Sequence, residues 1–303
     1  MYALSRGVSL RTAWFFRHWF WNNQTDSLKD FKIMQGILYL RNSETRIPIQ
    51  SLPLFNPRLD WLHWCMKHLS FRQTNNQLLA SYYMEKKPFR FLVRNFTDIL
   101  VIKEALWNLD YLWRTTKPAV MVDFGVNHAI VSLHCAASQC FWHIYGYELV
   151  PDTFKAALNN IALNPEIKDQ ITLENKGVGK TERIVDVGGF SSGDVRANIY
   201  GDNKVAGKEV LVKIIRASDV IEKVRKRHPG CGIYLKMDIE GAEEEVLEDL
   251  VETGQLMNIE TIIMEYHKGL HNKLSALLQD NGFGVRCQGA SYIGLLHAWR
   301  LHI

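Results

Sequence analysis

The 303-residue chain has no CxxC pair, no internal repeat and no low-complexity tract. Its cysteines are odd in number and widely spread, which excludes the spacings of a zinc finger or ribbon and indicates reduced thiols in a cytoplasmic protein. Hydrophobic residues make up 47% of the chain and charged residues 22%. These values are ordinary, so they exclude disordered and fibrous classes and predict a globular protein of one large or two modest domains.

A long uncharged apolar run is also missing. The most aromatic stretch, residues 8–21 (VSLRTAWFFRHWFW), is interrupted by Arg11 and Arg17. It is too short and too charged to span a bilayer, and no cleavage site for a secretion signal follows it. It could lie on a membrane surface as an interfacial helix, giving peripheral membrane contact. It could equally cover an apolar patch of the main domain or of a second copy, making a homo-oligomer, and we favour packing.

Negative charge is scarce in the first part of the chain. Residues 1–118 carry 17 Lys and Arg against 8 Asp and Glu, whereas residues 119–303 carry 19 against 24. A basic surface can meet nucleic acid, anionic lipid or a phosphorylated substrate. Because these charges are scattered, we favour an ordinary solvated surface.

The stretch around which the chain is organised is residues 118–137, PAVMVDFGVNHAIVSLHCAA. An apolar run at 119–122 predicts a strand buried on both faces, and it ends at Asp123 and Gly125. Apolar residues then recur at helical spacing from Ile130 to Ala137, with His134 on the same face. A strand, a glycine turn and a helix in this order are typical of nucleotide-binding folds.

The rest of the chain predicts an α/β fold with a doubly wound, mostly parallel, Rossmann-like sheet of seven strands. We expect an inserted hairpin at 184–218 and a terminal antiparallel hairpin at 282–289 and 292–300, because so short a connection requires antiparallel pairing. The predicted parallel strands are 119–124, 143–149, 171–178, 233–239 and 260–266, and the helices are 129–139, 152–163, 219–227, 242–253 and 269–280.

The region before this sheet is harder to interpret. Prolines at 48, 53 and 57 favour strands or loops over residues 31–60, and Leu59–Met84 is predicted to be mostly helical. Residues 89–113 are predicted to change from strand to helix, with Thr97 or Asp98 as the N-cap. We therefore divide the chain into an aromatic and basic accessory region, 1–88, and a catalytic domain, 89–303.

An acidic residue at the end of the second strand suggests the ligand. Glu148 can accept hydrogen bonds from both hydroxyls of a ribose, as acidic residues do in dinucleotide folds. A nicotinamide dinucleotide would require three glycines in the first turn, but only Gly125 is present. S-adenosylmethionine has no phosphate, so one glycine suffices. The turn therefore favours methyl transfer over hydride transfer.

Five segments together resemble a known family. They are VDFGVN (122–127), YELVPDTFKAALNNIALN (147–164), LKMDIEGAEEEVL (235–247), IIMEYH (262–267) and DNGF (280–283). They are similar to the FkbM-type family of class I S-adenosylmethionine-dependent methyltransferases, and the resemblance covers residues 90–283. The LK-D-EGAE block is its most specific part. Residues 93–111 also resemble the helix that precedes the first strand in that family.

The resemblance implies an S-adenosyl-L-methionine cofactor and the residues that bind it. We expect contacts from Asp123, Gly125, Asn127 and Glu148, with Arg94 and Asp98 helping to close the site. The chain departs from the family's Asp-x-Gly-Ala-Asn-x-Gly motif, because Val126 replaces the alanine, Ala129 replaces the last glycine and His128 stands between them. A Cβ at position 129 is expected to crowd the methionine half of the cofactor.

Residues at the ends of the fourth and fifth strands are expected to face the methyl acceptor, because ligands bind outside the carboxyl ends of parallel strands. Glu265 and His267 lie two apart on one strand, and we predict His267 to be the general base. Asp238 and Glu240 are predicted either to orient the acceptor or to hold a divalent cation that acidifies it. The three glutamates at 243–245 are interpreted as the acidic first turn of a helix.

The sequence thus predicts O-methylation of a hydroxyl on a small molecule or saccharide, a substrate class that the resemblance implies. Three alternatives remain open. The first is a non-catalytic binding or scaffold protein on this fold, which the departures at 128 and 129 suggest. The second is a nicotinamide-dependent oxidoreductase. The third is a nucleic-acid methyltransferase, for which only the basic first part of the chain argues.

Overall fold

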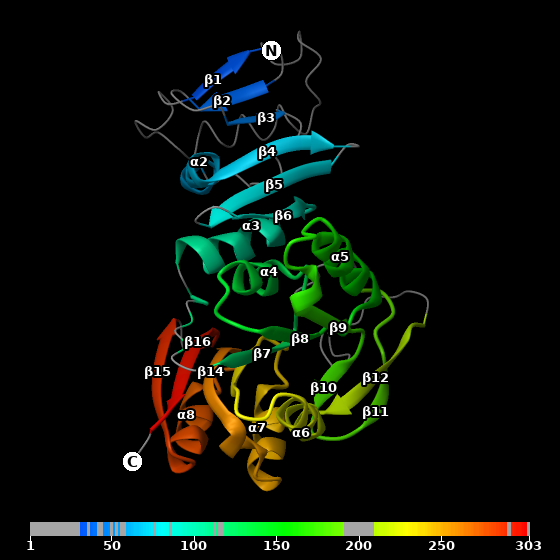
Figure 1. Ribbon diagram of the computed structural model, residues 1–303, viewed down its shortest axis with the longest axis vertical. Coiled ribbons are helices and arrows are strands. Elements are labelled where there is room, and N and C mark those ends of the chain that lie inside the picture. Colours follow the sequence, from blue (N-terminus) through cyan, green and yellow to red (C-terminus); the bar gives the residue numbers. More distant parts are fainter. Residues whose placement is uncertain are drawn as a thin grey trace. The chain divides into compact units, whose positions relative to one another are not determined.

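The computed structural model describes residues 31–301 apart from 35–36, 41–44, 49–50, 52–53, 55–58, 75–76, 85–86, 109, 112, 114, 116–117, 191–208 and 290–291 (Figure 1). The chain divides into two compact units, Met1–Asn108 and Leu109–Ile303. The predicted domain boundary after residue 88 lies earlier than this division, and it stays a prediction. The aromatic stretch at 8–21 lies outside the described residues, so its membrane or packing role also stays a prediction.

The described part of the first unit contains two antiparallel sheets with the strand orders β1-β2-β3 and β4-β5-β6. Its elements are β1 (Phe31–Met34), β2 (Ile37–Leu40), β3 (Arg46–Pro48), α2 (Leu59–His68), β4 (Leu69–Thr74), β5 (Gln77–Met84), β6 (Lys87–Val93), α3 (Phe96–Ile102) and the π-helical turn η4 (Lys103–Trp107). Strands at β1–β3 confirm the expectation for that stretch.

The prediction that Leu59–Met84 is mostly helical is wrong, because the helix ends at His68 and β4 and β5 form a hairpin. Phe71 in β4 and Leu78 and Ala80 in β5 are buried, with more exposed residues between them. This alternation has the period of a strand with one face on a core. The leucine-, alanine- and methionine-rich composition of β5 obscured that period in the sequence.

The expected change from strand to helix in 89–113 is confirmed, but the predicted N-cap at Thr97 or Asp98 is wrong. Asn95 caps α3, since its Oδ1 accepts the Asp98 N–H at 3.2 Å. Asp98 Oδ2 accepts the backbone N–H groups of Arg94 at 2.7 Å and Asn95 at 3.4 Å. Asp98 therefore supplies the returning half of a capping box, three residues inside the cap.

The second unit is built on a seven-stranded sheet with the order β15-β16-β14-β13-β7-β8-β9. Five of its strands are parallel, namely β7 (Ala119–Phe124), β8 (His143–Tyr147), β9 (Ile171–Glu174), β13 (Gly232–Met237) and β14 (Ile259–Tyr266). The hairpin of β15 (Phe283–Gly289) and β16 (Gly294–Arg300) completes it, with β16 antiparallel to β14. The predicted sheet and terminal hairpin are confirmed, and β7 is buried along its whole length.

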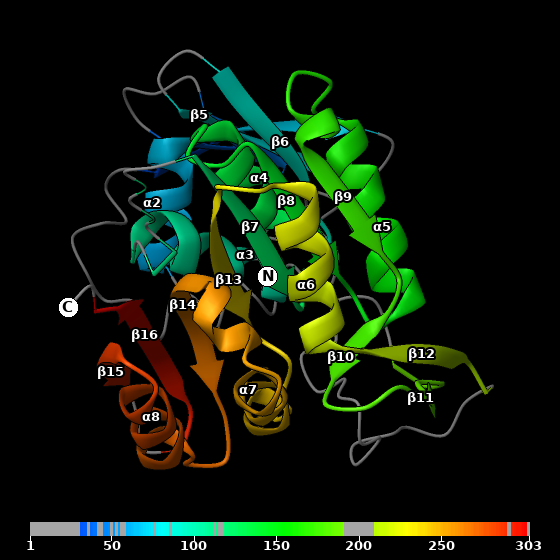
Figure 2. The ribbon, with the colours of Figure 1, turned by 60° about the horizontal axis from the view of Figure 1, so that its bottom comes forward.

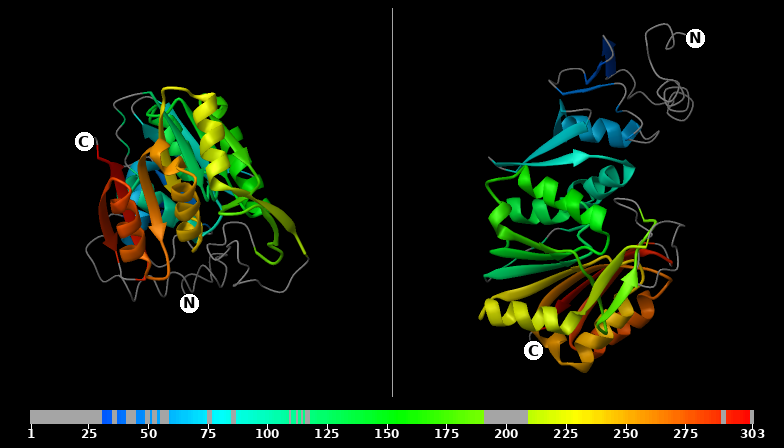
Figure 3. Two further views of the ribbon diagram at one scale, coloured as in Figure 1. Left: turned by 90° about the horizontal axis from the view of Figure 1, so that it is seen from below. Right: turned by 90° about the vertical axis from the view of Figure 1, so that its right-hand side faces the viewer.

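Helices cover both faces of this sheet, as doubly wound folds require. In the right-hand view of Figure 3, α4 (Ile130–Ala137) and α5 (Pro151–Ala162) lie on one face, and α6 (Ala217–Arg227), α7 (Glu243–Glu252) and α8 (His271–Asp280) lie on the other. Short 3-10 turns, η5 (Lys168–Gln170) and η6 (Gln255–Asn258), precede β9 and β14. Every residue of α4 is buried, and burial lowers the pKa of His134 to about 4.

The predicted single strand at 171–178 is wrong, because β9 ends at Glu174 and β10 (Gly177–Gly179) belongs to a second sheet. Between them, Asn175 Nδ2 donates to the carbonyls of Glu148 at 2.8 Å and Leu149 at 3.1 Å. The second sheet joins β10 to β12 (Leu211–Arg216) and β11 (Arg183–Asp186), and β12 leads directly into α6 (Figure 2). Antiparallel pairing of β11 and β12 confirms the inserted hairpin, whose residues 191–208 lie outside the described part.

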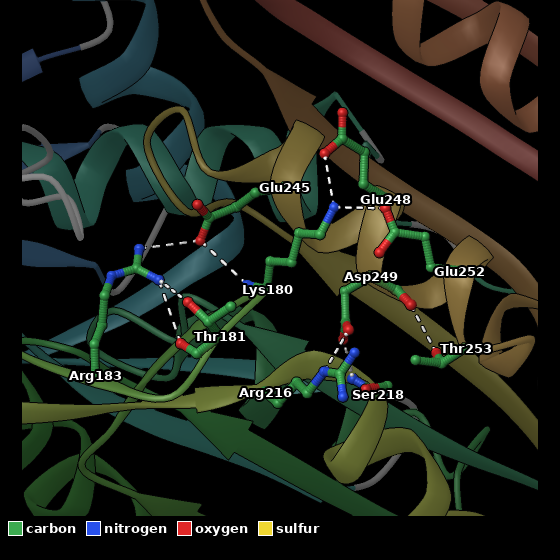
Figure 4. A network of polar contacts seen from close by, with 10 residues as sticks. All are labelled: Lys180, Thr181, Arg183, Arg216, Ser218, Glu245, Glu248, Asp249, Glu252 and Thr253. Atoms are coloured by element: carbon green, nitrogen blue, oxygen red, sulfur yellow. Dashed lines mark hydrogen bonds and ion pairs between the residues drawn. The ribbon is translucent and has the colours of Figure 1, made fainter.

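A network of ion pairs joins this small sheet to α7 (Figure 4). Lys180, after β10, contacts Glu248 and Glu252, and Arg183 contacts Glu245 at 3.1 Å. Beneath these partly exposed pairs, the fully buried Asp249 accepts from Arg216 Nε at 2.6 Å and from the Ser218 N–H at 2.7 Å. Asp249 thereby satisfies a free N–H group in the first turn of α6. Among the described residues, no helix is long and apolar enough to cross a membrane.

Candidate functional site

The candidate site lies where β7, β8, β13 and β14 end. The strands β8 and β13 flank β7 on opposite sides, so the chain order reverses here, and in open α/β sheets this is where ligands bind. The predicted cofactor residues of the second unit lie at or just after the ends of β7 and β8, and the predicted acceptor residues lie at or just after the ends of β13 and β14. The topology therefore brings the two predicted sets to one edge of the sheet.

Gly125 opens the turn after β7 with a φ of 83°, and it has a structural reason to be glycine. A Cβ at this position would lie 1.8 Å from the carbonyl oxygen of Asp238, so the ends of β7 and β13 could not approach each other. Lys236 Nζ donates to the Gly125 carbonyl at 2.5 Å. The turn is therefore held against β13 both by the Lys236 side chain and by the close approach of the two backbones.

The turn continues through two left-handed residues, Asn127 with φ 53° and Ala129 with φ 63°. Ala129 is fully buried and is the residue directly before α4. Ala129 thus adopts a left-handed backbone conformation that glycine favours, although alanine carries a Cβ. The backbone carbonyl of His128, between them, accepts from Asn160 Nδ2 of α5 at 2.8 Å, and the whole turn is braced by the neighbouring helix.

Glu148 lies directly beside this turn and is 7% exposed. Its Oε2 accepts the Asn127 N–H at 2.9 Å, and its Oε1 accepts the Val150 N–H at 2.9 Å. Burial raises the pKa of Glu148 to about 7, against the lowering effect of these two hydrogen bonds. The turn after β7 and the acid after β8, each predicted to bind the cofactor, are therefore in direct contact with each other.

Asp123 is fully buried, and its partners are protein groups. Ser132 Oγ donates to Oδ2 at 2.6 Å, and Lys236 Nζ lies 3.3 Å from Oδ1. Lys236 is itself only 3% exposed and lies 3.8 Å from Asp238 Oδ2. Burial opposes the charged form of Lys236, but Asp123 and Asp238 outweigh it and raise its pKa. A charged lysine thus links the end of β7 to the end of β13.

Three predicted acceptor-side residues cluster after β13 and β14. Asp238, Glu240 and His267 each offer an oxygen or nitrogen atom, and these atoms lie within 4.8 Å of one another. Such a spacing is compatible with a divalent cation, but His267 Nε2 already faces Glu240 Oε2 at 3.3 Å, as a group sharing a proton would. The fourth predicted residue, Glu265 near the end of β14, acts on Glu240 through its charge.

The electrostatics of this cluster differ from those of isolated side chains. Burial raises the pKa of Glu240 to about 8, and the negative charges of Asp238 and Glu265 add to the increase. Burial alone would lower the pKa of His267, but the hydrogen bond to Glu243 and the surrounding carboxylates raise it to about 9. Both pKa values lie above the ordinary ones, so the Glu240–His267 pair retains a shared proton near neutral pH.

Two residues of the site were missed by the sequence analysis. Glu243 was interpreted as a helix-dipole residue, but it is fully buried and its Oε1 lies 3.0 Å from His267 Nδ1. An acidic first turn is favourable at an exposed helix end, so all three glutamates at 243–245 received the same interpretation from the sequence. Only its burial distinguishes Glu243 from the other two. Lys236 was quoted only as part of a motif, although a lysine inside an apolar strand was a usable signal.

Two further predicted residues, Arg94 and Asp98, belong to the first unit. Asp98 is 1% exposed and is engaged in the cap of α3, and Arg94 donates from its side chain to the Leu92 carbonyl at 3.2 Å. Their predicted help in closing the cofactor site stays a prediction.

Fold and site together define a Rossmann-like α/β protein with a nucleotide-type turn at its topological switch point. Residues 123–285, more than half of the chain, match the methyltransferase FkbM domain. The chain belongs to this family, and the resemblance noted in the sequence is confirmed. A comparison with curated protein sequences found no match.

Solved structures with related folds include three that we name. The methyltransferase FkbM from Methylobacillus flagellatus is 14% identical with a TM-score of 0.43, and the match covers 62% of this chain but only 45% of that one. Sp1610 of Streptococcus pneumoniae, solved with S-adenosyl-L-methionine, is 13% identical (TM-score 0.40; 66% and 74% covered). Precorrin-6y C5,15-methyltransferase from Geobacter metallireducens is 14% identical (TM-score 0.35; 62% and 83% covered).

Proposed function

We propose that this protein is an S-adenosylmethionine-dependent methyltransferase that methylates a hydroxyl of a small molecule or saccharide. The observation that carries the proposal is the direct contact between the turn after β7 and the acid after β8, where Glu148 accepts the Asn127 N–H at 2.9 Å. Membership of the FkbM family supports the methyl-transfer chemistry. The saccharide or small-molecule class comes from the resemblance to the family.

The polar groups of this turn fit the cofactor. Each Glu148 oxygen accepts one backbone N–H and keeps a second lone pair, which suits the two hydroxyls of a ribose. Asn127 Oδ1 is buried and has no hydrogen-bond partner among the described residues. A ligand amino or hydroxyl group would satisfy it, and an unsatisfied buried acceptor is otherwise costly. When bound, the cofactor supplies a sulfonium-activated methyl group.

The buried pair of Lys236 and Asp123 has an indirect role in this proposal. Asp123 has no exposed surface, so it acts on the cofactor through Lys236, which holds the Gly125 carbonyl and faces Asp238. The pair fixes the distance between the turn and the end of β13. This is a supporting role in place of the direct contact that the sequence suggested.

The acceptor hydroxyl must lose its proton as its oxygen attacks the methyl carbon. We assign this proton to the Glu240–His267 pair, with Asp238 and Glu265 placed to orient the acceptor. His267 contributes as one member of the pair, because its imidazole already carries a proton near neutral pH. Burial and the neighbouring carboxylates raise the pKa of Glu240 to about 8, close to the range in which a general base works.

Calorimetry with S-adenosylhomocysteine tests the cofactor assignment. We expect the wild-type protein to bind it and Glu148→Ala to lose most of the affinity, because both ribose hydrogen bonds disappear. Glu174→Ala, a part-exposed glutamate at the end of the adjacent strand, serves as the matched control and should bind like the wild type. No binding by the wild type, or equal binding by Glu148→Ala, would sink the proposal.

The same assay separates the rival functions. Tight binding of NADH would favour an oxidoreductase. Binding of S-adenosylhomocysteine without methyl transfer to any hydroxyl compound would favour a non-catalytic protein. Binding to RNA that weakens steeply with salt would favour nucleic-acid methylation.

A further inference from the structure

We propose that Glu243 is a positioning residue, which keeps a proton on His267 Nδ1 and directs Nε2 at Glu240. The Glu240 carboxylate, which His267 holds in place, then accepts the proton of the methyl acceptor. This inference rests on the proposed function, and it moves the role of base from His267 to Glu240. It also gives a function to a glutamate that the sequence had placed only at a helix end.

The first step is the contact between Glu243 and His267. Glu243 is fully buried at the start of α7, and its Oε1 accepts the backbone N–H of Gly241 at 3.0 Å. The same oxygen lies 3.0 Å from His267 Nδ1. Because Oε1 already acts as an acceptor toward the Gly241 N–H, the ring is placed to donate to the same oxygen from Nδ1. A buried carboxylate thus fixes both the tautomer and the orientation of the ring.

The second step follows from the other ring nitrogen. With Nδ1 held by Glu243, Nε2 faces Glu240 Oε2 at 3.3 Å. A proton between them lies either on Nε2 or on Glu240, and in both cases this Glu240 oxygen is occupied by the histidine. The second oxygen of Glu240 remains for a ligand. His267 therefore holds Glu240 in place and stabilises its negative charge.

The third step compares exposure. The Glu240 and Asp238 side chains are each 27% exposed, whereas that of His267 is 9% exposed and that of Glu243 is fully buried. An acceptor outside the strand ends meets Glu240 and Asp238 before it meets the histidine. Glu240 also has a φ of 54°, a conformation that non-glycine residues avoid unless the surroundings enforce it. Of the three residues in contact, Glu243, His267 and Glu240, the most exposed is thus Glu240.

The proton and electrons balance within this arrangement. An oxygen lone pair of the acceptor forms the new bond to the methyl carbon, and the carbon–sulfur bond breaks with its electron pair staying on sulfur. The acceptor's O–H proton passes to the free oxygen of Glu240. Glu240 becomes neutral while His267 keeps both ring protons, and the proton later returns to solvent.

Other charged side chains around Glu240 also affect its proton. Asp238, Glu265 and Glu243 are negative, and they oppose deprotonation of Glu240. Lys236 Nζ lies 3.3 Å from Asp123 Oδ1 and 3.8 Å from Asp238 Oδ2. Lys268, next to His267, lies beside Gly241, since its Nζ would be 3.1 Å from a Cβ there. Among the described residues, the ion pair of Glu240 is with His267, whose Nε2 lies 3.3 Å from Oε2, so His267 is its direct partner.

Nuclear magnetic resonance of the full-length protein with ¹⁵N-labelled histidine tests the proposal without an identified acceptor. Loss of one ring signal in His267→Gln identifies His267 among the 11 histidines. In the wild type we expect a hydrogen-bonded Nδ1–H that exchanges slowly with water. In Glu243→Gln we expect that resonance to shift or to exchange at least about tenfold faster, because the charged acceptor is lost.

Glu244→Gln is the matched control, since Glu244 is the next residue of α7 and its carboxylate pairs with Lys273 instead. It should leave the His267 signals unchanged. A wild-type ring with its proton only on Nε2, or Nδ1–H exchange that is equal in Glu243→Gln and the wild type, overturns the proposal. If Glu243→Gln does not fold, the wild-type tautomer decides alone. Failure of S-adenosylhomocysteine binding would sink the proposed function but leave this outcome unaffected.

Discussion

Ala129 is a residue whose side chain disfavours the backbone conformation that it adopts. It holds a φ of 63° at the position where the family's motif has glycine. A left-handed alanine costs about 1–2 kcal/mol, whereas glycine adopts this conformation freely but loses more entropy on folding. The departure is therefore a local strain in the cofactor turn, and it can be measured.

We expect Ala129→Gly to raise the free energy of unfolding by about 0.5–1 kcal/mol in urea denaturation, because the relieved strain exceeds the added entropy cost. Ala136→Gly in the interior of α4 is the matched control. There the same substitution should lower stability by about 1 kcal/mol or more, since Ala136 is helical and fully buried. A destabilised Ala129→Gly would show that the Cβ is needed for packing.

Lys236 is the second residue whose effect can be isolated. We expect Lys236→Met to lower the free energy of unfolding by about 3–5 kcal/mol, because Asp123 is left buried without its cation. Adding Asp123→Asn should restore part of that loss, and urea unfolding of the single and double variants measures the coupling. Additive effects of the two substitutions would contradict a buried ion pair.

At the scale of elements, Asp249 determines how α6 begins. It lies in α7 but accepts the Ser218 N–H in the first turn of α6 and the Arg216 side chain. We expect Asp249→Asn to cost about 2 kcal/mol in urea denaturation, since charged hydrogen bonds of a buried group are lost. Glu252→Gln is the control, because its carboxylate is 57% exposed, and it should change stability by less than about 0.5 kcal/mol. Equal effects would mean that Asp249 is not a cap.

Elements with a strong local period could be predicted from the sequence. The parallel strands, the helices between them and the terminal hairpin follow from apolar runs and short connections. The break at Asn175 could not be predicted, because it depends on hydrogen bonds to Glu148 and Leu149 that are distant in sequence. The β4–β5 hairpin was missed because its period of two is carried by leucine and alanine, which also favour helices.

The residues of the candidate site also divide into those that the sequence predicted and those that it did not. Glu148 and the turn at Asn127 could both be named as cofactor residues from the sequence, because ligands bind where parallel strands end. The role of Glu243 required knowledge of its burial, which one sequence does not reveal, whereas Lys236 inside an apolar strand was a signal that the sequence analysis did not use. The pKa of His267 depends on three carboxylates from separate positions, so the ordinary value near 6.5 was a misleading guide to its role.

At the scale of the whole molecule, three raised pKa values act on stability in the same direction. They are those of Glu148 at about 7, Glu240 at about 8 and His267 at about 9. Each folded-state value exceeds its unfolded value, so the folded protein binds more protons. The stability that His267 contributes is fully present below pH 6.5 and is lost as the pH rises to about 9. The stability that Glu148 and Glu240 contribute is lost from pH 4.5 upward, until the pH reaches about 7 and about 8.

We therefore expect the wild-type protein to lose unfolding free energy between pH 6 and pH 9 through these groups, at about 1.4 kcal/mol per pH unit for each group that is protonated only in the folded state. Denaturant unfolding at both pH values measures the change. The double variant Glu240→Gln, His267→Gln should lose clearly less over the same range. An equal loss in the variant would show that other groups dominate the pH dependence.

The most direct test of the account is a structure of the protein with S-adenosylhomocysteine. The account predicts the ribose hydroxyls on Glu148, the methionine half along the turn from Gly125 to Ala129, and the sulfur facing the space beside Glu240. A ligand bound elsewhere, or one whose sulfur is turned away from Asp238, Glu240 and His267, would contradict it.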